Sequence, residues 1–190
     1  MMFRSLLLTL FFCAGQLCAQ EQVHRPEAAP WGVAVIMGHE TGDSAKSLGN
    51  DYGVELTWQF LRDHWVQGRV RGSILNVGRG EGAPDGLGFT PQQAKFLVVS
   101  CDWIFRPVKA HGLYFLLGAG ANYHQSDRYY VNGTDTQTGT NIALAWGVGW
   151  LIVNQVEVEL RQDALMVDFN PVFGGNRDVL CTNLVIRKRF

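Results

Sequence analysis

The sequence predicts an all-β fold, an eight-stranded antiparallel up-and-down transmembrane β-barrel, from three observations. Large apolar residues alternate with small or polar ones in segments about ten residues long, and the clearest is DYGVELTWQFL at 51–61. Long and short connections between these segments alternate along the chain. The strand faces without large apolar side chains carry charges of both signs. Successive side chains of a strand point to opposite faces, and a tilted strand of this length can cross a bilayer.

The chain begins with the pattern of a secretory signal peptide, predicted at 1–19. Arg4 precedes an apolar run from 5 to 12, and small residues follow that run. No small residue precedes either cysteine of this segment, which argues against a lipoprotein signal, and the run is too short for a membrane anchor. Cleavage leaves a short periplasmic lead-in at 20–29 and one barrel domain at 30–190.

The strands follow from alternating apolar residues, taken in chain order. They are expected at 30–38, 51–61, 65–76, 93–105, 113–124, 140–152, from 156 onward, and at 178–190. Their alternating large residues include Trp31, Val33, Val35 and Met37; Tyr52, Val54, Leu56, Trp58 and Phe60; Val66, Val70 and Ile74; Leu97, Val99, Cys101, Trp103 and Phe105; Phe115, Leu117 and Tyr123; Ile142, Leu144, Trp146, Val148 and Trp150; and Val156, Val158 and Leu160.

Connections of two lengths separate these strands. Short ones are predicted at 62–64, 106–112 and 153–154. The other four are longer, and their glycine-rich and polar composition predicts loops; they lie at 39–50, 77–92, 125–139 and 168–177. Short periplasmic turns that alternate with longer external loops are typical of transmembrane barrels.

The apolar strand faces could meet a soluble core, as in lipocalins, or lipid. The charged residues on the opposite faces favour lipid outside, because they cannot line a dry core unpaired but can pair with one another in a narrow lumen. The predicted lumen charge network consists of Asp51, Glu55, Arg69, Arg71, Asp102, Glu157, Glu159, Arg161, Asp163, Arg187 and Arg189.

The tryptophans also favour a membrane barrel. All six fall in the periplasmic half of this topology: Trp31, Trp58, Trp65, Trp103, Trp146 and Trp150. Four of them, Trp31, Trp58, Trp103 and Trp150, are predicted to form a periplasmic aromatic girdle. Without the signal, 15 basic and 17 acidic residues remain. No basic patch indicates nucleic acid as a partner.

The segments LYFLLGAGANYH (113–124) and NIALAWGVGWLIVNQVEVELR (141–161), together with the terminal Phe190, resemble the small outer-membrane β-barrel superfamily of Gram-negative bacteria, the OmpA/OmpX-type proteins. The resemblance implies an outer-membrane location, contact with outer-membrane lipid, and Phe190 as the signal read by the barrel-assembly machinery in the C-terminal strand. Lys188 stands where a second apolar residue is usual. Its long stem can reach toward lipid headgroups.

One pair of residues suggests an enzyme. His124 and Ser126 have the His-x-Ser spacing of the lipid A 3-O-deacylases, which this segment is similar to, and that resemblance implies an esterase. No acid follows at a comparable distance, and the alternation places His124 toward the lumen, away from lipid. The predicted catalytic set is therefore none, with these two residues as the alternative.

Other chemistry has little support in the sequence. Cys101 is predicted to face lipid and Cys181 the lumen, on opposite sides of the ring, so two free thiols are expected. The histidines His39, His64 and His111 lack metal-ligand spacing. No metal site and no cofactor are predicted.

The predicted function is that of a non-enzymatic outer-membrane barrel with a charge-plugged lumen. It acts structurally or through its extracellular loops, in envelope integrity, adhesion or binding of a surface ligand. A small pore is the alternative, and neutralising Arg69, Arg71 or Glu157 should then change its conductance. A lipid A-modifying acyl hydrolase is the third hypothesis.

Overall fold

The structure, a computed structural model, describes residues 30–41, 48–60, 65–79, 92–107, 112–130, 133–152, 155–168 and 176–190. Its strands are β1 (Trp31–Glu40), β2 (Leu48–Phe60), β3 (Val66–Arg79), β4 (Gln92–Phe105), β5 (Leu113–Tyr130), β6 (Gly133–Leu151), β7 (Val156–Asp168) and β8 (Asn176–Arg189). Within these ranges no helix has the length and apolar character to cross a bilayer. The predicted signal peptide and lead-in lie outside the described residues.

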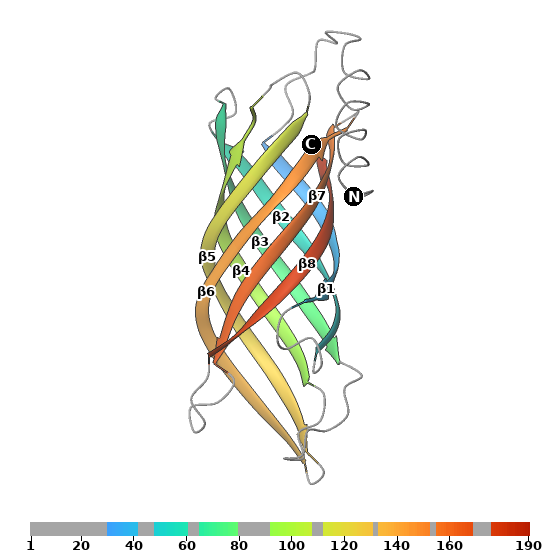
Figure 1. Cartoon of the computed structure of the whole chain (residues 1–190), viewed down its shortest axis with the longest axis vertical. Helices are drawn as coiled ribbons and strands as arrows, with labels where there is room; N and C mark the ends of the chain where they lie inside the picture. Colours follow the sequence, from blue (N-terminus) through green and yellow to red (C-terminus); the bar gives the residue numbers. More distant parts are fainter. Residues whose placement is uncertain are drawn as a thin grey trace, which may run out of the picture.

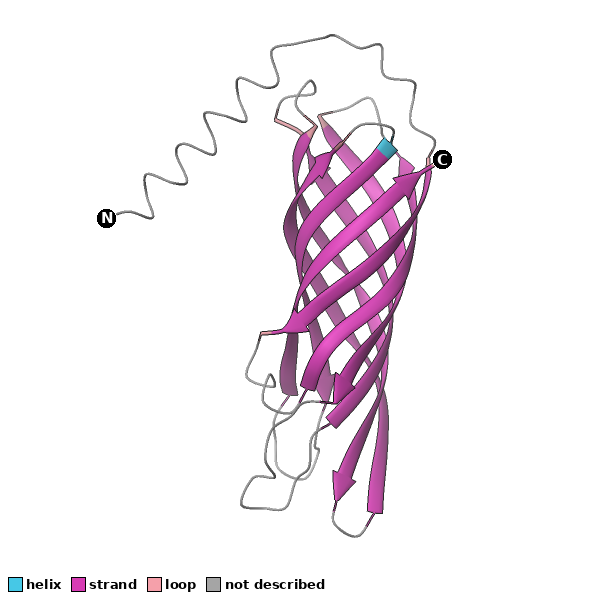
Figure 2. Cartoon of the chain, turned by 90° about the vertical axis from the view of Figure 1, so that its right-hand side faces the viewer, coloured by secondary structure: helices cyan, strands magenta, loops and turns pink. Residues whose placement is uncertain are grey.

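The eight strands close into a barrel, which confirms the predicted fold class. Each strand pairs antiparallel with the next along the chain, and β8 pairs with β1 (Figure 1 and Figure 2). Paired residues followed around the barrel from Trp31 return to β1 at Thr41, ten residues further along, where the Thr41 N–H donates to Leu180 O at 2.7 Å. Eight strands with this stagger enclose a space that side chains fill.

The barrel is apolar outside and charged inside. On the outer surface Trp58 is 41% exposed and Leu117 is 56% exposed, whereas Glu159 and Arg161 in the lumen are fully buried. A soluble barrel would show the opposite arrangement, because exposed apolar surface of this extent is unfavourable in water. The outer surface is therefore the one that meets lipid, as the sequence predicts.

The two ends of the barrel differ. The start of β1 and the end of β8 lie together, and the Phe190 N–H donates to Trp31 O at 3.0 Å. At the opposite end β5 and β6 continue past the other strands as a hairpin (Figure 1). β2, β4 and β6 end near the termini, and β1, β3, β5 and β7 end toward the hairpin.

The hairpin corrects one prediction. The sequence predicts a long polar loop at 125–139, but β5 runs on to Tyr130 and β6 starts at Gly133, with the pair Asp127↔Thr136 inside the former loop. Beyond the lipid a strand has no apolar face, so hydrophobic alternation disappears while the backbone ladder continues. The β-branched threonines of this segment suit a strand.

The other three long connections are shorter than predicted, for the same reason. β1 extends to Glu40 and β2 starts at Leu48, inside the predicted loop at 39–50. β3 likewise extends to Arg79, and β7 extends to Asp168. Paired strands therefore reach beyond the apolar belt on several sides of the barrel, where the sequence no longer alternates.

Glycine allows close packing between β4 and β5. A Cβ at Gly120 would lie 2.0 Å from Val99 O and 2.5 Å from Ser100 Cα, both backbone atoms that cannot move alone. At Gly72 on β3, a Cβ would meet nothing within 4 Å.

The variant Gly120→Ala should therefore lose about 1–3 kcal/mol of unfolding free energy, because the added methyl group overlaps backbone. Gly72→Ala, the matched control, should change stability by less than about 1 kcal/mol, in the stabilising direction. Urea unfolding of the barrel refolded into lipid vesicles measures both. Equal stability of the two variants would contradict the packing described for β4 and β5.

Candidate functional site

The lumen is the first candidate site, because the structure gathers the predicted charged residues there. All eleven have a relative exposure of 6% or less: Asp51, Glu55, Arg69, Arg71, Asp102, Glu157, Glu159, Arg161, Asp163, Arg187 and Arg189. Ten of them join one network of ion pairs across the barrel. Paired in this way, buried charges are tolerated inside a protein.

Glu159 on β7 lies at the centre of the network. Arg69 Nη1 and Arg187 Nη1 donate to its Oε1 at 2.5 and 2.6 Å, and the Tyr114 hydroxyl donates to the same oxygen at 2.6 Å. Arg69 Nη2 also donates to Asp102 Oδ2 at 2.9 Å. The donors to Glu159 come from β3, β5 and β8, so one carboxylate connects opposite walls of the barrel through strong charge-assisted hydrogen bonds.

A second group of ion pairs lies further from the termini. Arg71 Nη1 and Arg161 Nε donate to the two oxygens of Asp163, at 2.8 and 2.9 Å. Arg161 Nη1 donates to Glu55 Oε2 at 2.9 Å, and Arg187 Nη2 donates to Glu55 Oε1 at 2.5 Å. Each of these carboxylates therefore accepts from two arginines, which compensates the cost of removing it from water.

At the end that carries the termini, Glu157 holds three arginines. Arg187 Nη1 donates to its Oε2 at 2.8 Å, and Arg189 and Arg106 both reach its Oε1, Arg106 at 3.4 Å. The Arg106 guanidinium also lies over the Tyr114 ring, 4.9 Å from its centroid, in cation–π geometry. The lumen is therefore filled by side chains up to this mouth of the barrel.

The sequence analysis missed several members of the network. Arg106 lies beyond the expected end of its strand, yet it continues the inward alternation of Asp102 and Ile104 and is 6% exposed. Tyr114 lies on the inward face of β5 beside Leu116, and Ser100 accepts from Arg71 Nε at 2.8 Å. Strict alternation carried one residue past the strand end would have identified Arg106.

Asp51 is a predicted member of the network that the structure leaves outside it. It lies in the lumen, buried, but none of the ion pairs between described residues includes it. Its position on β2 is four residues from Glu55, nearer the hairpin end, where the inward side chains of the neighbouring strands are mostly apolar. The ion-pair network therefore does not extend as far toward the hairpin end as Asp51.

An apolar cluster fills the lumen toward the hairpin end. Its fully buried members are Ala34, Ile36, Leu75, Val77, Ala94, Phe96, Val98, Ala143, Leu165, Val179, Cys181 and Val185. They come from six strands, so they extend across the section of the barrel. The lumen thus has two layers, a mainly charged one near the termini, which also holds a small apolar cluster of Ile104, Tyr114, Leu116 and Ala145, and a mainly apolar one near the hairpin, whereas the sequence predicts charge alone.

Aromatic rings line the outer surface near the termini. The Trp31 and Trp58 rings are 6.4 Å apart, the Trp58 and Phe60 rings 5.7 Å, and the Phe60 and Trp103 rings 6.2 Å. Trp150 is 39% exposed at the same end of β6. The four tryptophans predicted for the girdle therefore lie on the outer wall, and Phe60 joins three of them into a continuous row.

Known proteins were compared with this chain by sequence and by structure. No family model and no curated protein matches it. The solved structures that match include Ail, the attachment invasion locus protein of Yersinia pestis, at 14% identity over 84% of this chain and 95% of that chain with a TM-score of 0.55; the N-terminal β-barrel domain of Pseudomonas aeruginosa OprF, at 12% over 86% and 100% with 0.59; and Neisserial surface protein A, at 13% over 87% and 100% with 0.55.

The chain has the fold of the small outer-membrane β-barrels. The likeness covers most of this chain and nearly all of each matched chain, although few residues are shared. It is therefore a likeness of fold.

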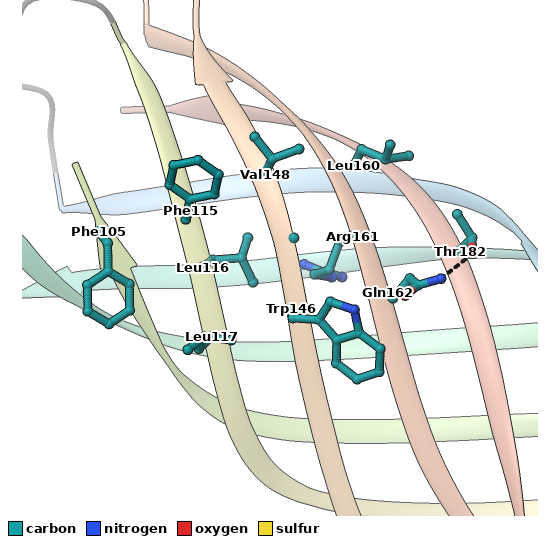
Figure 3. Close-up of a pocket in the computed structure, with 11 residues that line it drawn as sticks. Phe105, Phe115, Leu116, Leu117, Trp146, Val148, Leu160, Arg161, Gln162 and Thr182 are labelled. Carbon is teal, nitrogen blue, oxygen red and sulfur yellow. Dashed lines mark hydrogen bonds between the residues drawn. The ribbon is translucent and has the colours of Figure 1, made fainter. Parts of the chain in front are cut away.

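The outer wall of this outer-membrane barrel fold carries a second candidate site, a hollow of about 490 Å³ at Gly147 (Figure 3). Its lining is almost entirely apolar, from residues such as Phe115, Trp146 and Leu160. Two of its lining residues are hydrogen-bonded to each other, since Gln162 Nε2 donates to Thr182 Oγ1 at 3.3 Å (Figure 3). Because it lies on the apolar outer surface, this hollow meets lipid chains.

The two residues of the enzyme hypothesis, His124 and Ser126, both point into the lumen, as the sequence predicts. They are 1% and 0% exposed, and the His124 ring lies against Phe96 with the ring centroids 6.2 Å apart. Within the described residues, Ser126 Oγ has no hydrogen-bond partner, so the nucleophile–base hydrogen bond of an esterase is not made. The site is also closed to lipid.

The two cysteines of the barrel face opposite sides, as the sequence predicts. Cys101 is partly exposed on the outer wall of β4, and Cys181 is buried in the lumen on β8. Both are free thiols. Cys181 lies directly across from Asp163 in the pairing of β7 with β8.

Replacing Glu159 by Gln should destabilise the barrel by about 3–5 kcal/mol, because Arg69 and Arg187 would be left buried with less negative charge. Asp127→Asn, on the outer face of the hairpin, should stay within about 0.5 kcal/mol of the parent. Urea unfolding in lipid vesicles measures both free energies. If the Glu159 variant is as stable as the Asp127 variant, the network is not what holds the lumen together.

Proposed function

We propose that this chain is an integral outer-membrane protein without enzymatic activity, and that it acts by binding a surface partner through the protruding β5–β6 hairpin. The observation that carries the proposal is the free edge of this hairpin. The apolar belt, the row of rings near the termini and the fold shared with outer-membrane barrels support the location. Lipid of that membrane is then the first partner.

The edge belongs to β6. Its ladder with β5 runs from Gly133 to Trp150, whereas its ladder with β7 starts only at Ala143. No described strand pairs with the other side of β6 over 133–142. Along this stretch the backbone N–H and C=O groups of alternate residues point away from β5, and those before Ile142 can therefore pair with an extended segment of another chain.

The point where β6 and β7 separate is stabilised from inside the barrel. Asn122 Nδ2 donates to Ile142 O at 2.9 Å and to Met166 O at 3.3 Å. One amide thus satisfies a carbonyl on each diverging strand, which would otherwise lack partners. The separation of β6 from β7 is therefore stabilised by specific hydrogen bonds. This supports a hairpin that projects beyond the rest of the barrel wall.

The outer face of the hairpin suits contact with water and with a partner. β6 exposes a threonine at every second position: Thr134, Thr136, Thr138 and Thr140. Asp127 on β5 accepts a hydrogen bond from Thr136 Oγ1 at 2.8 Å. No lysine or proline interrupts β6 in this stretch, although natural edge strands often use these residues to prevent pairing.

Hairpin truncation tests the proposal. Joining His124 to Gly139 through an Asn-Gly turn should leave a barrel that still shows heat-modifiable mobility on a gel, while producing cells lose the attachment to protein-coated surfaces that the parent confers. A matched control places the same turn at 153–154, at the opposite end of the barrel. Equal attachment by the truncated and parent proteins would sink the hairpin proposal.

Charge on the edge gives a finer test. Thr136→Lys with Thr138→Lys should abolish attachment, because lysine on an edge strand opposes strand addition. The serine versions of both positions keep the polarity and should retain attachment. Limited proteolysis from outside the cell reports whether the hairpin remains folded in each variant.

The predicted assembly signal and girdle belong to the same proposal. Phe190 is 61% exposed at the end of β8, where the barrel-assembly machinery would read it, and Lys188 is exposed on the same outer face. We propose that Trp31, Trp58, Trp103 and Trp150 lie at the periplasmic interface, since aromatic side chains favour the headgroup region.

A small pore is the second candidate function, and the filled lumen opposes it. Planar bilayers with the parent protein should show no stable single-channel conductance. The apolar cluster excludes water from the lumen between the charged layer and the hairpin end. Phe96→Ala should produce conductance steps by opening that cluster, and neutralising Arg71 alone should not. Stable steps from the parent protein that change with Arg69, Arg71 or Glu157 would establish the pore instead.

A further inference from the structure

One carboxylate in the lumen forms no ion pair with any arginine or lysine among the described residues. Asp51 on β2 is 3% exposed, and neither of its oxygens has a hydrogen-bond partner. The side chain of Cys181 contacts it, but a thiol is a weak donor. The nearby Asp163 adds a second negative charge to its surroundings. A buried carboxylate in this position is unfavourable unless a bound cation or a proton neutralises it.

A second unpaired oxygen points to the same place. Asn183 on β8 is fully buried, and its Oδ1 has no hydrogen-bond partner, while its Nδ2 donates to Asp163 Oδ2 at 2.8 Å. The position of a Cβ on Gly38 would be 2.0 Å from Asn183 Oδ1 and 2.4 Å from Asp51 Oδ1, so these two oxygens are at most 4.4 Å apart. Among the described residues, two acceptors thus converge with only the weak thiol donor of Cys181 beside them.

The strand register explains the convergence. Gly38 on β1 pairs with Asp51 on one side and with Asn183 on the other. Because the middle residue has no side chain, the two flanking side chains occupy the space over it. Turning the Asn183 amide over would not remove the conflict, since its oxygen would then face Asp163 at the distance now occupied by the donor.

We propose that Asp51 and Asn183 form a site for a hard cation such as Ca²⁺ at the seam where β1 closes the barrel against β8. Oxygen ligands at 2.3–2.6 Å from Ca²⁺ fit two oxygens separated by up to about 4.4 Å, and water supplies the remaining ligands. A soft transition metal does not fit these donors, and the described residues hold no group of three His, Cys, Asp or Glu side chains placed for a metal ion.

The cation would link β2 and β8 across β1. Asp51 belongs to β2, Asn183 to β8, and Gly38 of β1 lies between them. The bound ion would therefore join the second and last strands through side chains, over the strand that closes the barrel. Its effect should be on the stability of the closed barrel.

Calcium titration of the full-length mature barrel in detergent tests the site. Isothermal calorimetry with CaCl₂ should show saturable binding, and the unfolding temperature on heat-modifiability gels should rise with CaCl₂ at constant ionic strength held by choline chloride. In Asp51→Asn the heat of binding and the rise should both disappear. Asp127→Asn, which removes an acid from the outer face of the hairpin, should keep both.

Each other result has a defined meaning. A rise with NaCl equal to that with CaCl₂ supports the site and makes its ion monovalent. Absence of binding heat with the parent protein overturns the proposal, whether or not Asp51→Asn folds. An unchanged calcium response in Asp51→Asn also overturns it, as does stabilisation by lower pH with no response to any cation, which would mean that a proton neutralises Asp51.

Discussion

The pairing of buried charges across a narrow lumen is the constraint on which this barrel depends. Five arginines and five carboxylates of the predicted network meet inside eight strands, and Glu159 alone accepts from three walls. Long side chains of this kind need room. The inward residues of β5 and β6 supply it, because a Cβ at Gly118 would be 2.3 Å from Asp102 Oδ1 and one at Gly149 would overlap the Tyr114 ring. The glycines of some strands therefore leave the space that the long or charged side chains of neighbouring strands occupy.

The division of the lumen into two layers assigns different tasks to its parts. Near the termini, arginine and carboxylate side chains cross-link the walls. Near the hairpin, apolar residues such as Phe96 and Leu165 exclude water from the part of the lumen that they fill. A lumen filled in this way leaves little room for a transported solute. The surfaces at the barrel ends remain open to a partner. It also isolates Asp51, which lies at the side of the apolar layer without an arginine.

The hairpin end gives the molecule a surface that lipid does not cover. β5 and β6 keep their ladder beyond the point at which β6 leaves β7, and Asn122 completes the backbone hydrogen bonding at the divergence. Strand addition needs an ordered free edge as well as exposed donors and acceptors. This hairpin offers both, which distinguishes it from a polar loop of the same composition.

The sequence by itself determined the strand number, the up-and-down order, the apolar outer face and the burial of all eleven predicted lumen charges. It could do so because side-chain alternation with a period of two survives wherever one face of a strand meets lipid. Tertiary structure alone decided the hairpin at 125–139, since a strand in water on both faces carries no hydrophobic period. It also decided which charges pair: Arg106 joins the network and Asp51 does not, because the partner of an inward side chain depends on register around the ring, and that register is set by hydrogen bonds between distant strands.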